Sequence, residues 1–249
     1  MRDNVNVHGV VIDNVTMTEA VDRLYSFLDQ EKNHSIFTPN SEILMNAQRD
    51  AELRNVLNMS DMTVADGAGV VLASKILGNR LVAKVSGIDL VENLFLQTSK
   101  KEISFFFLGG KVGVAKEAKE KVANSYLGVK VVGYNDGYFS FEEEKDVIEK
   151  INSSNADVLL VGLGAPKQEK WIHKNKDKLK VKVCIGIGGA LDVFAGQVKL
   201  APDFFRRNGL EWLYRLYKEP WRFKRMLNIP QFILLSLAVR MGIRKNPKL

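Results

Sequence analysis

Asp66 is the residue whose setting in this sequence most favours catalysis. It follows a short apolar run that begins at Met62, and it precedes Gly67 and an apolar segment of helical period. This pattern predicts a strand, a tight turn and a helix. Ligands of open α/β sheets bind at the carboxyl ends of the strands, so we expect Asp66 at a crevice, as a general base. The alternative is that Asp66 and Gly67 are simply turn residues.

Three glycine-bearing turns follow predicted strands and open predicted helices, at residues 108–111, 161–168 and 185–192. Glycine allows the backbone to approach a pyrophosphate closely, and a helix N-terminus adds free N–H groups and a positive dipole. The candidate nucleotide-binding glycines are Gly109, Gly110, Gly164 and Gly188. The alternative is that these glycines only fit tight turns between strand and helix.

The same turns argue against the common cofactors. The sixth position of the dinucleotide fingerprint holds Lys167 in one turn and Leu191 in the other, and no Gly-Lys-Ser/Thr sequence occurs. NAD and ATP are therefore disfavoured. The three histidines are scattered and no Asp-x-Asp pair occurs, so we expect a site that needs neither a metal nor another cofactor.

Six motifs are spread over nearly the whole chain, at residues 38–40, 65–70, 106–110, 162–169, 186–196 and 209–216. Their order and spacing resemble those of the WecG/TagA/CpsF glycosyltransferase family. The resemblance implies an inverting, metal-independent sugar transfer at the inner face of the cell membrane. In the most similar members, N-acetylmannosamine moves from UDP to the 4-hydroxyl of N-acetylglucosamine in undecaprenyl-diphospho-N-acetylglucosamine. That β-1,4 transfer is an early step of teichoic acid linkage-unit synthesis.

The chemistry of an inverting transfer suits the residues at the predicted strand ends. One carboxylate must take the proton of the acceptor hydroxyl while UDP leaves from the opposite face of the sugar, and Asp66 is our candidate. Thr38 and Asn40 offer donors and acceptors for sugar hydroxyls or an acetamido group. Gln168, at a helix start, could reach a diphosphate oxygen or the donor sugar. For Asn40 the alternative is a helix N-cap.

The resemblance places two further residues on the nucleotide side of the site. Asp192 would accept a hydrogen bond from the uracil, and Tyr138 would stack on the base or bond to it. From its position alone, Asp192 is equally a helix-start acid that complements the helix dipole. The chain departs from the family pattern at two expected phosphate contacts, where Lys84 and Leu200 stand in place of the common arginine.

Alternating strands and helices must position these side chains. Apolar runs rich in Val, Ile and Leu are separated by amphipathic helical patterns, which predicts a mostly parallel, Rossmann-like sheet covered by helices on both faces. The predicted strands are residues 35–38, 62–66, 103–108, 129–134, 157–161 and 181–187, and a short strand pair is predicted within residues 5–12. Cys184 lies in one of these runs, as a buried thiol. We expect this α/β core to span residues 1–200.

Residues 201–249 are predicted to form a basic amphipathic appendage. From Arg206 onward the chain has eleven Lys or Arg and two acids, a charge of +9, whereas the preceding residues sum to −2. Arg215, Arg222 and Arg225, together with Lys84 of the core, are candidates to neutralise the diphosphates of donor and acceptor. The interleaved aromatic and aliphatic residues suit a lipid headgroup layer, and the alternative is a helix that faces the core.

The expected partners are a UDP-sugar, a polyprenyl-diphosphate-linked acceptor and an anionic membrane surface, with a homo-oligomer possible. The first residues contain no secretory signal and the apolar run at 232–239 is too short to span a bilayer, so we expect a cytoplasmic, peripheral protein. Three alternatives stay open: UDP-N-acetylmannosaminuronic acid or another UDP-sugar as donor, a soluble acceptor with an appendage that serves oligomer contacts, and a basic nucleic-acid-binding module, which the tryptophans disfavour.

Overall fold

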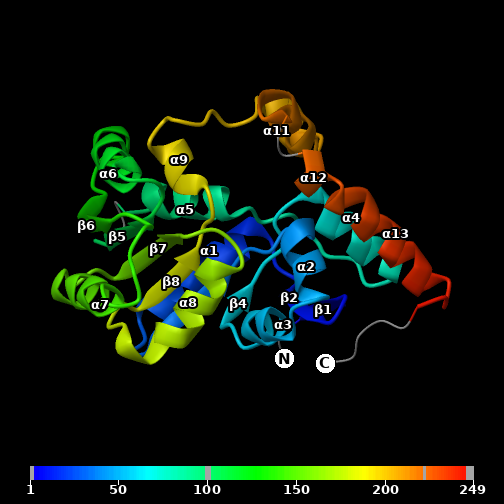
Figure 1. Ribbon diagram of the computed structural model, residues 1–249, viewed down its shortest axis with the longest axis horizontal. Coiled ribbons are helices and arrows are strands. Elements are labelled where there is room, and N and C mark those ends of the chain that lie inside the picture. Colours follow the sequence, from blue (N-terminus) through cyan, green and yellow to red (C-terminus); the bar gives the residue numbers. More distant parts are fainter. Residues whose placement is uncertain (1–2, 99–101, 221–222, 245–249) are drawn as a thin grey trace.

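The computed structural model describes residues 3–98, 102–220 and 223–244. Its centre is a parallel sheet (Figure 1). The six strands of this sheet have the order β4-β3-β8-β7-β5-β6. The strands are β3 (His34–Phe37), β4 (Met62–Thr63), β5 (Ser104–Gly109), β6 (Lys130–Asn135), β7 (Val158–Gly162) and β8 (Val183–Gly186). A separate antiparallel pair is formed by β1 (Asn4–Val7) and β2 (Val10–Asp13). The predicted parallel sheet and strand pair are confirmed.

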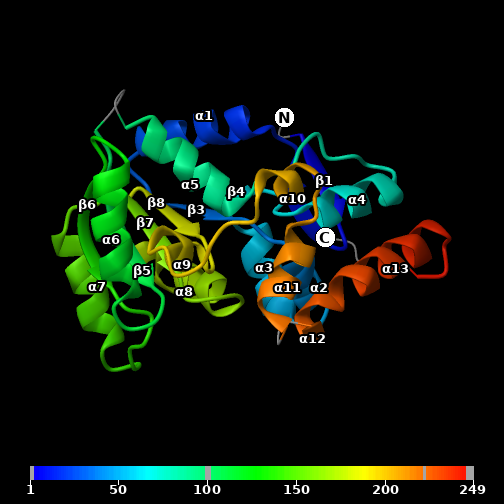
Figure 2. The same ribbon diagram turned by 90° about the horizontal axis from the view of Figure 1, so that it is seen from above.

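Helices cover both faces of the sheet (Figure 2). One face is covered by α1 (Met17–Leu28), α5 (Gly87–Leu96), α6 (Val114–Ser125) and α9 (Ala190–Phe194). The other face is covered by α2 (Ser41–Ala47), α3 (Ala51–Asn58), α4 (Ala68–Leu77), α7 (Glu144–Ser153) and α8 (Lys167–Asn175), which continues into the short 3₁₀ helix η1 (Lys176–Lys178). The layered α/β arrangement follows from strands that are apolar on both sides.

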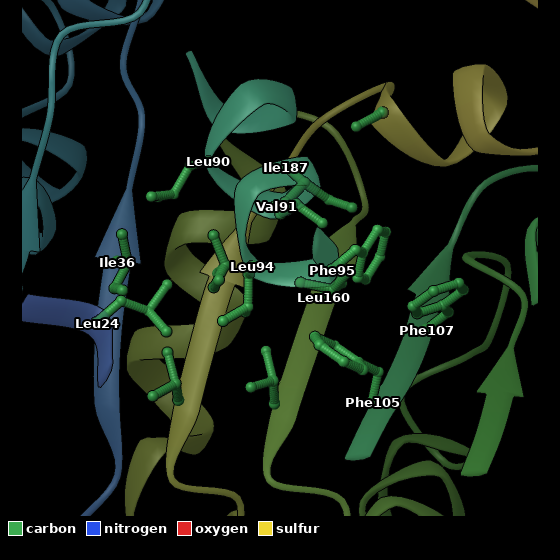
Figure 3. Close-up of a cluster of buried hydrophobic side chains, with 14 of the residues drawn as sticks. Leu24, Ile36, Leu90, Val91, Leu94, Phe95, Phe105, Phe107, Leu160 and Ile187 are labelled. Atoms are coloured by element: carbon green, nitrogen blue, oxygen red, sulfur yellow. The ribbon is translucent and has the colours of Figure 1, made fainter. Parts of the chain in front are cut away.

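Side chains that alternate along each strand supply the two cores. Phe105 and Phe107 of β5 contribute to the core beneath α5 (Figure 3), whereas Phe106 contributes to the core on the opposite face. Cys184 belongs to this second core, where burial raises the pKa of its thiol to about 12. The prediction of a buried thiol is confirmed.

The C-terminal segment contains α10 (Asp203–Arg207), α11 (Glu211–Lys218), α12 (Phe223–Met226) and α13 (Asn228–Arg240). Helix α13 lies beside α4 and α2 (Figure 1). Its Phe232 is fully buried in the core that includes Val7 and Leu44, and the Oγ atom of Ser236 lies 2.8 Å from Nε2 of His8. Helix α13 therefore packs against the core, whereas Trp212, Leu213, Phe223 and Leu227 before it are between 38% and 57% exposed. A lipid contact of these earlier residues stays a prediction. The domain boundary at residue 200 stays a prediction.

No helix within the described ranges has the length and apolar content needed to cross a bilayer. The longest C-terminal helix, α13, has 13 residues, against about 20 for a membrane span.

Candidate functional site

The glycine turns meet one another at the carboxyl edge of the sheet. A Cβ atom on Gly109 would lie 2.4 Å from the carbonyl oxygen of Gly162, and one on Gly162 would lie 2.8 Å from that of Gly188. Gly109 also has a positive φ of 135°, a conformation that other residues rarely adopt. Glycine is thus required here by the close packing of three turns. A role of these glycines toward a nucleotide stays a prediction.

Backbone hydrogen bonds hold Asp66 at the same edge of the sheet. The Asp66 N–H donates to the Pro39 carbonyl at 3.1 Å, and the Val85 N–H donates to the Ala65 carbonyl at 2.9 Å. Gly67, with a φ of 100°, then turns the chain into α4. The prediction of a turn and helix after Asp66 is confirmed, and its carboxylate comes at the end of an extended segment next to β3.

Asp66 lines a cavity of about 350 Å³. The walls come from the N-terminal end of α2, the first half of α4, and the helices α11, α12 and α13. Asn40 and Glu42 line it beside Asp66, and Glu211 and Arg215 line it from α11. The structure thus brings the predicted base together with Asn40 and Arg215, although Arg215 is about 150 residues away in the sequence.

Burial, together with nearby charges, makes Asp66 a carboxyl group that changes protonation near neutral pH. Burial and the Glu211 carboxylate raise the pKa of Asp66 to about 7, while Arg215 and Lys84 act in the opposite direction. Glu211 itself forms an ion pair with Lys84. A carboxyl group with a pKa near 7 is well matched to general base catalysis at neutral pH.

Two ion pairs attach α10 and α11 to the rest of the chain next to this cavity. Lys84 pairs with Glu211, and Asp89 of α5 pairs with Arg206 of α10. Between these helices, Gly209 approaches the start of α4 so closely that a Cβ atom on it would lie 2.6 Å from Cβ of Ala68. Helix α11 is therefore held over the carboxylate of Asp66 by charge and by close packing.

Asn40 and Thr38 lie on the loop that follows β3. The Asn40 side chain accepts a hydrogen bond from the Ile43 N–H at 3.1 Å, so the N-cap interpretation is confirmed. This bond uses the carbonyl oxygen of the side chain and leaves its NH₂ group for a ligand in the cavity. Thr38 lies outside the cavity lining, where its hydroxyl donates to the Gly186 carbonyl of β8 at 3.4 Å.

Gln168 is buried, and both ends of its amide are engaged within the protein. Its Oε1 accepts a hydrogen bond from the Gly188 N–H at 2.9 Å, and its Nε2 donates to Oε1 of Glu169 at 2.8 Å. Burial raises the pKa of Glu169. In this arrangement Gln168 fixes the glycine turn after β8, and its contact with a substrate stays a prediction.

Tyr138 and Asp192 lie apart from the Asp66 cavity. Tyr138 is exposed and lines a separate hollow of about 250 Å³ near Asn135 and Lys150. It follows β6, at the opposite end of the sheet from β4, and the strand spacing puts those two strands roughly 24 Å apart. Asp192 lies in the first turn of α9, as its helix-start interpretation requires. The predicted contacts of both residues with the base remain untested.

Of the residues predicted to supply positive charge at the diphosphates, the structure describes the side chains of Lys84 and Arg215. Lys84 is engaged by Glu211, whereas Arg215 makes no ion pair within the part of the chain that the structure describes. Arg222 and the side chain of Arg225 lie outside the described residues. Within those ranges, no three His, Cys, Asp or Glu side chains gather as metal ligands. The expectation of a metal-independent site is left to experiment.

Sequence reasoning missed two carboxylates of the cavity, Glu42 and Glu211, and most of its apolar lining. Glu211 stands within the motif at residues 209–216, so its presence in a motif was the available signal. Its pairing with Lys84 could not be seen, because the two residues are far apart in the sequence.

The sequence profile of the glycosyl transferase WecG/TagA/CpsF family matches residues 5–246. An N-acetylglucosaminyldiphosphoundecaprenol N-acetyl-beta-D-mannosaminyltransferase of Bacillus subtilis (strain 168) is 38% identical over 93% of this chain and 90% of its own. Proteins of the same name from Bacillus spizizenii and Staphylococcus aureus (strain MRSA252) are 39% and 32% identical, over 85% and 97% of this chain and 82% and 95% of their own.

Proposed function

We propose that this protein, which belongs to the WecG/TagA/CpsF glycosyl transferase family, transfers N-acetylmannosamine from UDP to undecaprenyl-diphospho-N-acetylglucosamine. The acceptor atom is the 4-hydroxyl of N-acetylglucosamine and the linkage formed is β-1,4. Relatives that cover most of both chains are named for an N-acetyl-beta-D-mannosaminyl transfer to an N-acetylglucosaminyl diphosphoundecaprenol. The observation in this chain that best supports the proposal is the cavity in which Asp66 and Arg215 meet.

In the proposed step, the Asp66 carboxylate takes the proton of the acceptor hydroxyl as that oxygen bonds to the anomeric carbon of the donor sugar. The bond from this carbon to the UDP oxygen breaks on the opposite face, so configuration is inverted. The electron pair of that bond leaves with UDP. Arg215 and Lys84 supply positive charge near the diphosphates, and the N–H groups of the glycine turns add to it.

The reaction can be tested with purified protein, a panel of UDP-sugars and a short-chain diphospho-N-acetylglucosamine acceptor. We expect a disaccharide product with UDP-N-acetylmannosamine, identified by mass, and a β-1,4 linkage by NMR. Product formation only with UDP-N-acetylmannosaminuronic acid would favour the alternative donor. If no UDP-sugar is turned over while the protein binds RNA or DNA tightly with a steep salt dependence, the nucleic-acid-binding alternative gains support.

The pH dependence of the reaction should report the protonation state of Asp66. A base works only when deprotonated, and because the pKa of Asp66 is raised to about 7, kcat/KM should rise with pH through about 7 and then level off. Glu211→Gln removes a charge that raises this pKa, so the rise should move to lower pH, by on the order of one unit. Lys84→Met removes an opposing charge and should move it to higher pH.

The control for this pair of variants is Asp203→Asn, because Asp203 is exposed on α10 and its only described ion pair is a 3.9 Å contact with Arg206. Its pH profile should match that of the unmodified protein. If Glu211→Gln and Lys84→Met shift the profile in the same direction, or leave it unmoved, a group other than Asp66 controls the pH dependence.

Metal removal should leave the rate unchanged. The proposed step assigns the positive charge at the diphosphates to side chains and backbone N–H groups, so an excess of EDTA should have no effect on initial rates at saturating substrates. The check is a comparison of rates with EDTA, with added Mg²⁺ and with neither. Activity lost to EDTA and restored by Mg²⁺ would assign that charge to a metal ion instead.

A further inference from the structure

The cavity above Asp66 has an apolar wall that the proposed sugar chemistry does not use. This wall consists of Leu72 on α4, Trp212 on α11, Met226 at the end of α12, and Ile229 and Ile233 on α13. Leu72 is 48% exposed and Trp212 is 38% exposed. Sugar hydroxyls need hydrogen-bonding partners, which the aliphatic members of this wall cannot supply.

The apolar wall extends away from the carboxylate in one direction. Helices α4 and α13 lie side by side (Figure 1). They run parallel, because Gly69 lies next to Ile229 near their N-terminal ends and Gly78 lies next to Arg240 at their C-terminal ends. Asp66 stands just before α4, and Leu72 lies one helical turn, about 6 Å, beyond Ala68. The polar residues therefore lie at the start of α4, and the wall follows its first turns.

We propose that the apolar wall binds the first isoprenoid units of the acceptor lipid, next to its diphosphate. The inference rests on the proposed function and adds a binding site for the hydrocarbon part of that substrate. It assigns a ligand of one chemical class, a prenyl chain carried by a diphosphate, to Leu72, Trp212, Ile229 and Ile233.

The order of chemical groups along the cavity matches their order along the acceptor. Asp66 serves the sugar hydroxyl at one end. Arg215, three residues after Trp212, lies on the same face of α11, so a cation stands beside the start of the apolar wall. A diphosphate at Arg215 would leave its prenyl chain against Trp212 and the aliphatic side chains.

The spacing of the apolar side chains along α13 suits an extended prenyl chain rather than a compact ligand. Ile229, Ile233 and Leu237 are separated by four residues and form one stripe along the helix. The first two line the cavity, and Leu237, further along, is 39% exposed. The stripe therefore leads out of the cavity along α13, as a prenyl chain that continues toward a membrane would require.

The test compares two acceptors that share the diphospho-N-acetylglucosamine head and carry either a farnesyl or a methyl group. The assay contains neither vesicles nor detergent and keeps the farnesyl acceptor below its micelle concentration, so that membrane docking contributes nothing. The unmodified protein should prefer the farnesyl acceptor on the order of tenfold or more in kcat/KM. Leu72→Ser and Ile233→Ser should bring this ratio close to one.

The matched control is Leu234→Ser, because Leu234 is 64% exposed on α13 and lies outside the cavity lining. Its acceptor ratio should equal that of the unmodified protein. Because the ratio compares two substrates of one protein sample, partial unfolding of a variant does not alter it. An unmodified protein that uses both acceptors equally well, or a Leu72→Ser variant that keeps the full preference, would overturn the inference.

A binding measurement separates this inference from the proposed function. Trp212 lines the cavity, so farnesyl diphosphate should shift the tryptophan emission to shorter wavelength, whereas inorganic diphosphate should not. Trp212→Phe should remove the shift. If neither acceptor is turned over but farnesyl diphosphate gives this shift, the proposed reaction fails and the prenyl site stands. If the two diphosphates give equal signals while sugar transfer proceeds, only the prenyl site fails.

Discussion

Replacing Asp66 by Asn should lower kcat on the order of a hundredfold or more while the fold stays intact. The side chain lines the cavity and its pKa is raised to about 7, which suits the proposed role of accepting a proton. Loss of a general base typically has an effect of this size. The measurements are kcat with the short-chain acceptor at pH 8 and the melting temperature of the same samples.

The cavity offers its own controls for this prediction. Glu42 and Glu211 are the other two carboxylates in its lining, so Glu42→Gln and Glu211→Gln remove an acid from the same site. Both should retain turnover at pH 8, where Asp66 is deprotonated in either background. If Glu42→Gln or Glu211→Gln shows the hundredfold loss while Asp66→Asn remains active, the base has been assigned to the wrong residue.

The difference in stability between Asp66→Asn and the unmodified protein should change with pH in a definite direction. The pKa of Asp66 is raised in the folded protein above its ordinary value of 3.8, so the folded state binds the proton more tightly than the unfolded state does. Between pH 4 and 7 the contribution of Asp66 to the stability of the unmodified protein therefore falls as pH rises. Asparagine carries no charge, and the variant should melt at a higher temperature than the unmodified protein at pH 8, with a difference that shrinks toward pH 4.

Local patterns predicted the elements of this fold well. The apolar runs form the expected strands, and the pattern Thr16 to Glu19 forms a capping box at the start of α1. Helix α7 was not predicted, because its sequence is mostly charged and buries only a narrow stripe around Val147 and Ile151. The strand order also could not be predicted, since it places β3 beside β8, about 150 residues later in the chain.

The candidate site was predicted where its residues follow strands, and missed where it depends on contacts across the fold. Asp66 and Asn40 stand after neighbouring parallel strands, so their proximity follows from topology. The position of Glu211 over Asp66 depends on how α11 packs on the core, and no local sequence pattern predicts that packing. The hydrogen bond from the Gly188 N–H to Gln168 could not be predicted either, because it joins two turns that are 20 residues apart, and a contact of Gln168 with a substrate stays a prediction.

Arg215→Gln should lower turnover on the order of a hundredfold, even with an acceptor that needs no membrane. Arg215 lines the cavity with Asp66 and makes no ion pair within the described ranges, so its charge is available for the diphosphates. Loss of one group that stabilises developing negative charge commonly has an effect of this size. Arg215→Lys should recover only part of the activity, because a planar guanidinium binds two phosphate oxygens at once.

The control must separate this chemical role from membrane docking. Lys218 is exposed three residues later on α11, beside the rings of Tyr214 and Tyr217, and lies outside the cavity lining. Each basic residue near an anionic bilayer contributes about 1 kcal/mol, so Lys218→Gln and Arg215→Gln should each weaken binding to phosphatidylglycerol vesicles about fivefold. Only Arg215→Gln should lose turnover of the short-chain acceptor.

Point substitutions test the appendage better than a truncation before Arg206, because truncation would also remove Phe232 from the core. A folded Arg215→Gln variant that turns over the short-chain acceptor at the full rate would limit this arginine to docking. The charge for the leaving diphosphate would then come from Lys84 and from the helix N-termini behind the glycine turns. In that case Lys84→Met, which also frees Glu211 from its ion pair, should show the larger loss of turnover.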